Sequence, residues 1–418
     1  MSKFLIQGGQ KLNGVISVSG SKNAALPIIA ATLLTDQKCV IRNVPKIADI
    51  DVMLEILADL GAEIAWIGEH TLEINTKNVK SYTPNPVLVN SIRASVLFMG
   101  PLLMRFGKVK IAKPGGCLIG SRPLDTHLEA FADLGATIKN DGKFFNLEIK
   151  KIKNSYIALR EISVTATENI LMASCIASQN VTINLAACEP EVSDLANFLN
   201  KMGAAIKGIG SHKLEVSKCK KLKGIDYTII PDRIEAATFI IAGAVTKGKL
   251  LIKNVIPEHL DYVLIKLRNI GVNFRVNKNS IEVLPNSNFK ATNIRTDIYP
   301  GFATDFQAPI SVLLTQSKGK SEIFETLFEG RLNYIHELVK MGANAKLIDK
   351  HNAEIYGPTK LVGKKITTLD LRAGATLILA ALVAKGTSEI DRIELIDRGY
   401  ENIEKRLNLV GAKIKRVN

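Results

Sequence analysis

Hydrophobic and polar positions repeat along this 418-residue chain with a period of about 70 residues. Each repeat opens with an alanine-rich segment that is apolar on nearly every face, as in residues 24–34 and 236–245. A turn and a short β-like triplet follow, then an amphipathic helix such as residues 50–61, and then one or two strands. A helix that is apolar on all sides has to be buried. The pattern therefore predicts six units, each with one buried helix, one amphipathic helix and short strands.

Two markers recur in the same phase and support the repeat. A glycine ends each amphipathic helix, and successive glycines are 68 to 74 residues apart. A turn residue follows each apolar helix, and glycine or asparagine there suits the left-handed conformation of a helix end. The helix-ending glycines are Gly61, Gly135, Gly203, Gly271, Gly342 and Gly411, and the turn residues are Gln37, Gly107, Asn180, Gly248, Gly319 and Gly386. We predict an α/β protein of two globules, each with three repeats, helices inside and sheets outside.

At one equivalent position, just before or at the start of each buried helix, four of the six repeats carry a polar or charged residue. Counting fourteen residues back from the turn markers gives Asn23, Arg93, Ala166, Ile234, Asp305 and Arg372. A charge at the end of a buried helix is costly unless it is paired or faces solvent. Helix capping would explain Asn23 and Asp305, but cations such as Arg93 and Arg372 oppose the helix dipole there. We therefore predict a functional cleft at these helix ends, with capping as the alternative.

One linker is longer than its equivalents and carries a cysteine. The second unit has about four extra residues after its strand triplet, and they include the sequence PGGC with Cys117. Lys113 and Arg122 lie close to it in sequence, and cationic neighbours favour the thiolate. Cys117 is thus a candidate reactive residue, whereas Cys39, Cys175, Cys188 and Cys219 are interpreted as core. The corresponding linkers of units two, five and six hold Arg122, Arg331 and Arg398.

Composition narrows the class of partner. The net charge of +15 favours anionic partners, which include nucleic acid, a membrane surface and phosphorylated substrates. Aromatic residues make up 6% of the chain, and no nucleic-acid-reading motif accompanies the basic residues. The lysine-rich run at 218–224 is interpreted as solvated surface. We expect no nucleic-acid partner.

Other classes are also disfavoured by the sequence. No apolar run is long enough to span a membrane, and the first residues do not resemble a signal peptide, so we expect a cytoplasmic protein with no membrane partner. The cysteines and histidines show no metal-ligand spacing, so no metal and no cofactor are predicted. His127 is interpreted as a packing or hydrogen-bonding residue near the cysteine loop.

At this point six stretches of sequence resemble one family. They are SGSKNAALP (19–27), KPGGCLIGSRPLDTHL (113–128), PDRIEAATF (231–239), TDFQAP (304–309), DLRAGA (370–375) and DRGYENIE (397–404). In this order, and over essentially the whole chain, they resemble the UDP-N-acetylglucosamine 1-carboxyvinyltransferases, which are enolpyruvyl transferases. The resemblance implies two inverse α/β barrel domains of three repeats each. The expected domains are residues 1–21 with 231–418, and residues 22–230 with the cysteine loop.

The resemblance also implies a reaction. The enolpyruvyl group of phosphoenolpyruvate moves to the 3-hydroxyl of UDP-N-acetylglucosamine with release of phosphate, as the first committed step of peptidoglycan synthesis. Addition needs a proton at the methylene carbon and removal of a proton from the sugar hydroxyl. By resemblance Cys117 is the acid and Asp305 the base. Cys117 is also the family's target for the epoxide fosfomycin.

Binding residues follow from the same resemblance. The expected phosphoenolpyruvate-binding residues are Lys22, Asn23, Arg122, Arg331, Arg372 and Arg398, with Asp370 in support. The expected UDP-N-acetylglucosamine-binding residues are Arg93, Arg122, Pro123, Leu124, Asp125, Thr126, Ser163, Val164, Asp305 and Leu327. Two positions depart from the family pattern. Ala166 replaces a glycine, and Glu161 stands where some members have a lysine that helps to hold the diphosphate.

Two other functions are alternatives. The 5-enolpyruvylshikimate-3-phosphate synthases share the fold and the donor, but they do not require the loop cysteine or the RPLDTHL stretch. A basic nucleic-acid-binding module would show a steep salt dependence of binding.

Overall fold

The computed structural model describes residues 2–115, 119–120, 122–153 and 155–417. The candidate acid Cys117 lies outside the described residues. The chain divides into two compact units, which are described separately. Unit 1 comprises the described residues of Met1–Ser19, Leu118–Ser121 and Pro231–Asn418, and unit 2 those of Gly20–Cys117 and Arg122–Ile230. The domain boundaries expected from the repeats stay a prediction.

Unit 1 contains three four-stranded sheets. Their orders are β21-β22-β1-β23, β15-β16-β14-β2 and β17-β18-β20-β19. The strands are β1 (Lys3–Gln7), β2 (Asn13–Ser17), β14 (Lys249–Lys253), β15 (Asn273–Asn277), β16 (Ser280–Leu284), β17 (Ile294–Arg295), β18 (Gly319–Phe324), β19 (Asn344–Leu347), β20 (Asn352–Gly357), β21 (Lys365–Thr367), β22 (Thr387–Asp391) and β23 (Ile414–Val417). Each sheet combines antiparallel pairs with one parallel pair. The parallel pairs are β2 with β14, β17 with β18, and β21 with β22.

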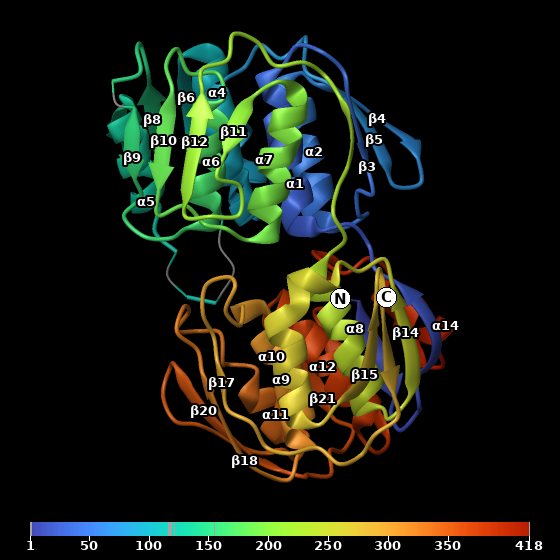
Figure 1. Cartoon of the computed structure of the whole chain (residues 1–418). Helices are drawn as coiled ribbons and strands as arrows, with labels where there is room; N and C mark the ends of the chain where they lie inside the picture. The colour runs from blue at the N-terminus through green and yellow to red at the C-terminus, as the bar shows by residue number, and fades with distance from the viewer. Residues whose placement is uncertain (1, 116–118, 121, 154, 418) are drawn as a thin grey trace. The chain divides into compact units, whose positions relative to one another are not determined.

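Helices fill the inside of unit 1. They are α8 (Arg233–Val245), η3 (Pro257–Leu260), α9 (Asp261–Ile270), α10 (Thr304–Thr315), α11 (Ile335–Lys340), α12 (Leu371–Val383), α13 (Glu394–Asp397) and α14 (Ile403–Leu409). Figure 1 shows α8, α10 and α12 in the middle of the unit with strands around them. These three helices pack against one another, and every residue of α8 is buried. The predicted arrangement of apolar helices inside and sheets outside is confirmed here.

Unit 2 repeats the same plan. Its sheets have the orders β13-β3-β5-β4, β11-β12-β10-β9 and β6-β8-β7. The strands are β3 (Cys39–Arg42), β4 (Glu63–Gly68), β5 (Thr71–Asn75), β6 (Lys108–Ala112), β7 (Thr137–Asn140), β8 (Phe144–Glu148), β9 (Tyr156–Ala158), β10 (Val181–Asn184), β11 (Ala205–Lys207), β12 (Lys213–Ser217) and β13 (Asp226–Thr228). The helices are α1 (Lys22–Ala31), η1 (Thr32–Leu34), α2 (Ala48–Leu60), α3 (Pro86–Ser91), η2 (Arg93–Phe98), α4 (Met99–Phe106), α5 (Asp125–Leu134), α6 (Val164–Ser174) and α7 (Pro190–Met202).

The apolar helix of the second repeat differs from a single α-helix. It begins as the 3₁₀ helix η2 and continues as α4. Pro101 lies in the first turn of α4, where its missing N–H leaves no intrahelical hydrogen bond unmade. Arg93 still stands at the first position, as the repeat predicts.

The predicted helix-ending glycines are found at or just after the helix ends. Gly61, Gly135, Gly203 and Gly271 are the C-cap residues of α2, α5, α7 and α9. Their φ angles of 99° to 114° lie in the left-handed region that favours glycine. Gly342 and Gly411 lie one residue beyond the C-caps Met341 and Val410.

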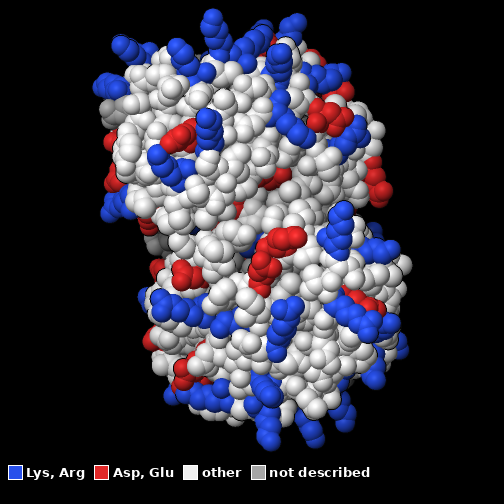
Figure 2. All heavy atoms as spheres, viewed as in Figure 1, with Lys and Arg blue, Asp and Glu red and all other residues white. Residues whose placement is uncertain are grey.

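The surface carries the excess positive charge. Figure 2 shows lysine and arginine side chains spread over the visible face of both units, interspersed with acidic residues. Among the described residues, no helix is both long and apolar enough to cross a membrane.

Candidate active site

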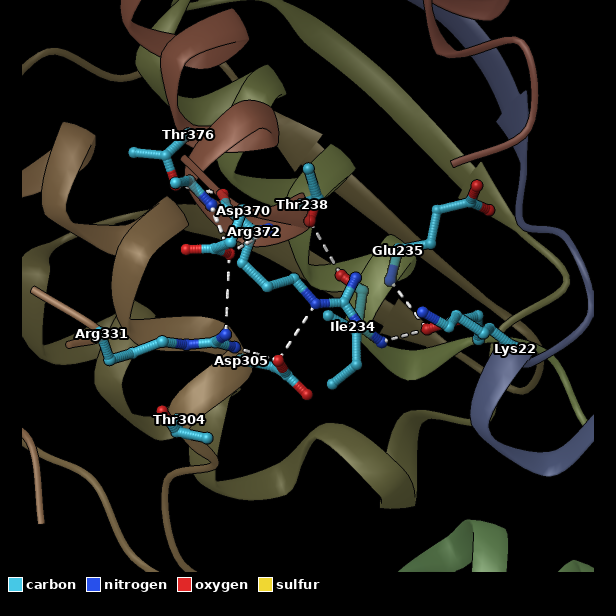
Figure 3. A network of polar contacts seen from close by, with 12 residues as sticks. Lys22, Ile234, Glu235, Thr238, Thr304, Asp305, Arg331, Asp370, Arg372 and Thr376 are labelled. Atoms are coloured by element: carbon cyan, nitrogen blue, oxygen red, sulfur yellow. Dashed lines mark hydrogen bonds and ion pairs between the residues drawn. The ribbon is translucent and has the colours of Figure 1, made fainter. Parts of the chain in front are cut away.

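The predicted base Asp305 lies in unit 1 beside two arginines. It is the second residue of α10, and its carboxylate accepts hydrogen bonds from Arg331 and, at 3.1 Å, from Nε of Arg372. Both arginine side chains are about 95% buried, and Figure 3 shows them converging on the carboxylate. The N-cap of α10 is Ala303, without a side-chain hydrogen bond. Asp305 therefore forms ion pairs, and the capping alternative does not describe its contacts.

The ion pairs control the ionisation of Asp305. Burial raises the pKa of the carboxyl, but the charges of Arg372 and Arg331 outweigh it and hold the pKa well below its ordinary value. Asp305 is thus ionised at neutral pH. A carboxylate held so strongly by two cations is a weak proton acceptor in this arrangement.

Asp370 organises the two arginines. It is the N-cap of α12 and accepts from the backbone N–H groups of Arg372 at 2.8 Å and Ala373 at 3.2 Å. The same oxygen, Oδ1, lies 3.6 Å from Nη1 of Arg331. Arg331 therefore lies beside two carboxylates, and Asp370 offers it a second ion-pair partner.

A buried glutamate holds the loop that contains Leu327. Glu325, just after β18, is fully buried, and its Oε1 accepts from Leu327 N at 2.9 Å. Its Oε2 accepts from Thr304 Oγ1 at 2.7 Å, at the first residue of α10. Glu325 thereby connects the Leu327 loop to the helix end that carries Asp305. The sequence analysis missed this residue.

In unit 2, Lys22 and Asn23 begin α1. Lys22 Nζ lies 2.6 Å from Asp49 Oδ2 in the first turn of α2, and both side chains are mostly buried. Ser21 is the N-cap and accepts from Ala24 N at 3.3 Å. Capping of α1 is therefore done by Ser21 and not by Asn23. Asp49 is a second residue that sequence reasoning missed.

A cationic cluster in unit 2 surrounds the predicted nucleotide-sugar residues. Arg93 Nη2 donates to the carbonyl of Pro123 at 3.1 Å. Burial, followed by the charge of Arg122, lowers the pKa of Arg93 to about 10. Among the described residues, Nε of Arg93 and Nδ1 of His127 are buried atoms without a hydrogen-bond partner. Buried polar atoms usually have partners, so this cluster fits an anionic ligand with hydrogen-bond acceptors.

Two hydrogen bonds join the segment 125–127 to the segment 161–165. Thr126 Oγ1 donates to Glu161 Oε1 at 3.0 Å, and His127 Nε2 lies 3.0 Å from Thr165 Oγ1. Ser163 and Val164 form the N-cap and the first residue of α6. Glu161 thus links the two predicted nucleotide-sugar segments, and Ala166 is buried in the first turns of α6.

His127 provides a test of this cluster. Burial, then the charges of Arg93 and Arg122, lower the pKa of His127 to about 3. An unfolded histidine titrates near 6.5, so below that pH the unfolded chain binds a proton that the folded chain does not. The free energy of unfolding should therefore decrease as the pH is lowered from about 6.5 toward about 3. This group contributes at most about 1.4 kcal/mol per pH unit to the decrease.

We expect His127→Gln, which keeps a hydrogen-bonding group toward Thr165, to weaken this pH dependence. Urea denaturation of both proteins at about pH 7.5 and about pH 4.5 measures it. The loss of unfolding free energy on acidification should be smaller for the variant. An equal loss in both proteins would contradict a neutral buried imidazole.

The predicted site residues fall into two groups. Unit 1 holds Leu327, Asp305, Arg331, Asp370, Arg372 and Arg398, and unit 2 holds Lys22, Asn23, Arg93, Arg122, Pro123, Leu124, Asp125, Thr126, Ser163 and Val164. The structure brings Asp305 together with Arg331 and Arg372, and Arg331 with Asp370. It also brings Arg93 to Pro123. Arg398 is the half-buried C-cap of α13. The roles of all these residues stay predictions.

Arg233 is a further functional candidate that sequence reasoning missed. It is 93% buried at the first position of α8, with its guanidinium 5.4 Å and 5.5 Å from the ring centroids of Tyr299 and Phe306. The available signal was its place directly before Ile234, the repeat-equivalent position. Like Arg93, Arg233 is a cation at the first position of a helix, where the helix dipole disfavours positive charge.

Comparison with known proteins places the chain in a family. The family model described as EPSP synthase (3-phosphoshikimate 1-carboxyvinyltransferase) matches residues 6–407. Curated UDP-N-acetylglucosamine 1-carboxyvinyltransferases of Koribacter versatilis and Clostridium acetobutylicum are 44% and 45% identical to it. Each alignment covers 100% of this chain, with 97% and 100% of the respective relative.

Solved structures share the fold. The enolpyruvyl transferase NikO from Streptomyces tendae superposes with a TM-score of 0.90 at 23% identity, over 100% of this chain and 99% of NikO. An EPSP synthase from Acinetobacter baumannii superposes with a TM-score of 0.76 at 17% identity, over the whole of both chains. These likenesses confirm the predicted fold class. The chain therefore belongs to the EPSP synthase family of enolpyruvyl transferases, and its full-length curated relatives within that family are UDP-N-acetylglucosamine 1-carboxyvinyltransferases.

Proposed function

We propose that this protein transfers the enolpyruvyl group of phosphoenolpyruvate to the 3-hydroxyl of UDP-N-acetylglucosamine and releases phosphate. The observation that carries the proposal is the identity of 43 to 45% with curated carboxyvinyltransferases over essentially the full length of this chain. The clustering of arginines around the predicted substrate residues supports it, because both substrates are anions.

The proposed reaction is an addition followed by an elimination. A proton is added to the methylene carbon of phosphoenolpyruvate, and the sugar oxygen bonds to the neighbouring carbon while its own proton is removed. The tetrahedral intermediate then loses phosphate and a proton from the methyl carbon, which restores the double bond. We assign Cys117 as the acid that protonates the methylene carbon and Asp305 as the base for the sugar hydroxyl.

The ion pairs of Asp305 add a condition to this mechanism. While Arg331 and Arg372 both contact the carboxylate, its pKa is too low for efficient proton abstraction. Arg331 also lies 3.6 Å from Asp370. A shift of Arg331 from Asp305 to Asp370 removes one cation from the base and raises its pKa. We assign Asp370 this supporting role.

The two unit 2 clusters suit the anionic parts of the substrates. Arg93 and Arg122 provide donors for a diphosphate, and Nδ1 of His127 adds one in the tautomer in which Nε2 accepts from Thr165. Lys22 and Asn23 stand at the start of α1, where the helix dipole favours the phosphate and carboxylate of phosphoenolpyruvate. The contact of Glu161 with Thr126 leaves that acidic side chain as a link between segments and not as a phosphate ligand.

The finer consequences are also proposals. The product would enter peptidoglycan synthesis in the cytoplasm, so the enzyme would contribute to cell-wall formation, cell shape and division. The thiol of Cys117 would be the point of attack by fosfomycin. The name shared by the curated relatives and the sequence around Cys117 support these statements.

A direct assay tests the function. We expect phosphate release from phosphoenolpyruvate when UDP-N-acetylglucosamine is the acceptor and no release above background with shikimate 3-phosphate. Both acceptors are tested with the same enzyme preparation, and the enolpyruvyl product is identified by mass spectrometry. Release with shikimate 3-phosphate alone would overturn the proposal in favour of the shikimate reaction that the family model's description names.

A further inference from the structure

A buried carboxylate in unit 2 lies outside the predicted substrate-binding residues. Asp194 is on α7 and is 3% exposed. The hydroxyl of Tyr227 in β13 donates to its Oδ1 at 2.6 Å, and the backbone N–H of Ile230 donates to its Oδ2 at 3.3 Å. Each oxygen therefore has its own donor. An asparagine has an acceptor oxygen at only one of these two positions and a donating NH₂ group at the other, so one donor loses its acceptor.

Ile230 is in turn bonded to the start of α1. Its carbonyl accepts from the N–H of Ser21 at 2.8 Å, and Ser21 Oγ accepts from Ala24 N. Three hydrogen bonds in series thus run from Asp194 to the first turn of α1. That turn carries Lys22 and Asn23, the predicted phosphoenolpyruvate ligands.

The same residues mark the first entry of the chain into unit 2 and its last exit from that unit. We call Ser19–Ser21 and Ile230–Asp232 the crossing segments, because unit 2 begins at Gly20 and ends at Ile230. The crossing segments are bonded to each other by Ser21 N to Ile230 O and, within unit 1, by Asp232 N to Ser19 O at 2.9 Å. Within unit 2, the Asp194 side chain on α7 accepts from Ile230 and so anchors the two bonded crossing segments.

Asp194 is costly to keep ionised. Burial raises its pKa to about 6, against the lowering effect of the hydrogen bonds from Tyr227 and Ile230. Of the charged neighbours, Glu191 on the same helix raises the pKa and Lys201 lowers it. A carboxyl whose pKa is raised in the fold destabilises the fold as pH rises from about 4 through about 6. Stabilisation of the fold at neutral pH therefore does not explain why a buried carboxylate occupies this position.

We infer that Asp194 is a positioning residue for phosphoenolpyruvate binding. Its carboxylate fixes Ile230, and through Ser21 it fixes the helix turn that presents Lys22 and Asn23. This inference rests on the proposed function and extends it to a residue that touches neither substrate. Asp194 also lines an open groove of about 660 Å³ with Asn197, Lys201 and Tyr227, so protons from solvent reach its surroundings.

The test compares three variants with the wild type. Asp194→Asn should raise the KM for phosphoenolpyruvate by roughly 5- to 10-fold, the scale expected for loss of one ordinary hydrogen bond. The KM for UDP-N-acetylglucosamine should change little. Asp226→Asn is the matched control, because Asp226 is an exposed carboxylate of β13 paired with Arg42 and should leave both KM values unchanged.

Tyr227→Phe keeps the carboxylate and covers the case in which Asp194→Asn does not fold. Removing the Tyr227 hydroxyl takes away a contact that lowers the pKa of Asp194. The acidic limb of the pH profile of kcat/KM for phosphoenolpyruvate should therefore move to higher pH in this variant. In Asp194→Asn the part of that limb due to Asp194 should be absent.

Hydrogen–deuterium exchange gives a readout that does not depend on activity. Peptides covering residues 20–31 and 226–231 should exchange faster in Asp194→Asn than in the wild type and Asp226→Asn. Wild-type KM, pH profile and exchange in both Asp194→Asn and Tyr227→Phe would overturn the inference. A wild type inactive with both substrates would overturn the proposed function, and the exchange data would then still decide whether Asp194 orders the start of α1.

Discussion

Asp305→Asn is expected to lower kcat by roughly two or more orders of magnitude, the usual scale for loss of a general base. The amide cannot accept the proton of the sugar hydroxyl, whereas its size and shape are those of the carboxylate. Binding of UDP-N-acetylglucosamine should therefore persist and be measurable by calorimetry. Turnover is followed as phosphate release at saturating substrate.

The control for this experiment has to remove an equivalent ion pair. Glu404 is a 95% buried carboxylate in the first turn of α14, paired with Arg416 at 2.9 Å in the same unit. Glu404→Gln should lower thermal stability and leave kcat near the wild-type value. If Asp305→Asn behaved in the same way, with normal turnover and reduced stability, Asp305 would serve only to neutralise Arg331 and Arg372.

Cys117→Ser should also reduce turnover by roughly two or more orders of magnitude, whereas Cys117→Asp should retain catalysis at mildly acidic pH. The reason is acidity, because a hydroxyl has a far higher pKa than a thiol and is a poor proton donor near neutrality. The aspartate keeps a protonatable acid but cannot form the thioether with an epoxide. Cys117 lies outside the described residues, so this prediction depends on the sequence.

Turnover across pH is measured for the wild type and both cysteine variants, with and without fosfomycin. The wild type should lose activity in the presence of the epoxide, and the aspartate variant should keep it. A serine variant as active as the wild type would exclude Cys117 as the proton donor. An aspartate variant that remained fully sensitive to fosfomycin would place the reactive nucleophile elsewhere.

The repeat pattern was sufficient to predict the inner helices and the residues at their starts. Asp305 and Arg372 hold equivalent positions at the second residues of α10 and α12, and the structure places Arg372 Nε 3.1 Å from Asp305. Equivalent positions of packed repeats lie at the same end of the helix cluster. The periodicity therefore placed these two charges at the same end of the helix cluster, although it did not predict their ion pair or identify Arg331 as the second partner.

The carboxylates that organise the site were harder to predict. Asp49 and Asp194 lie on amphipathic helices, and acidic residues near the start of a helix are common for electrostatic reasons alone. A single sequence does not distinguish a carboxylate turned to water from one buried against Lys22 or Tyr227. Glu325 follows a strand, where polar loop residues are ordinary. Their partners come from distant parts of the chain, so local pattern carried no signal for them.

The N-terminal strand has a consequence for how the protein is made. β1 lies between β22 and β23, and Lys3 is aligned with Asp391 on one side and Val417 on the other. At synthesis rates of about 5–20 residues per second, its partners leave the ribosome roughly 20–80 s after it does. Unit 2 is complete by Ile230 and is free to fold in that interval, while β1 stays unpaired as a nascent segment with the three consecutive apolar residues Phe4–Ile6. The sheet around β1 is therefore completed only after β23 has been synthesised, and a chain truncated before residue 414 would leave one edge of β1 exposed to chaperones and to aggregation.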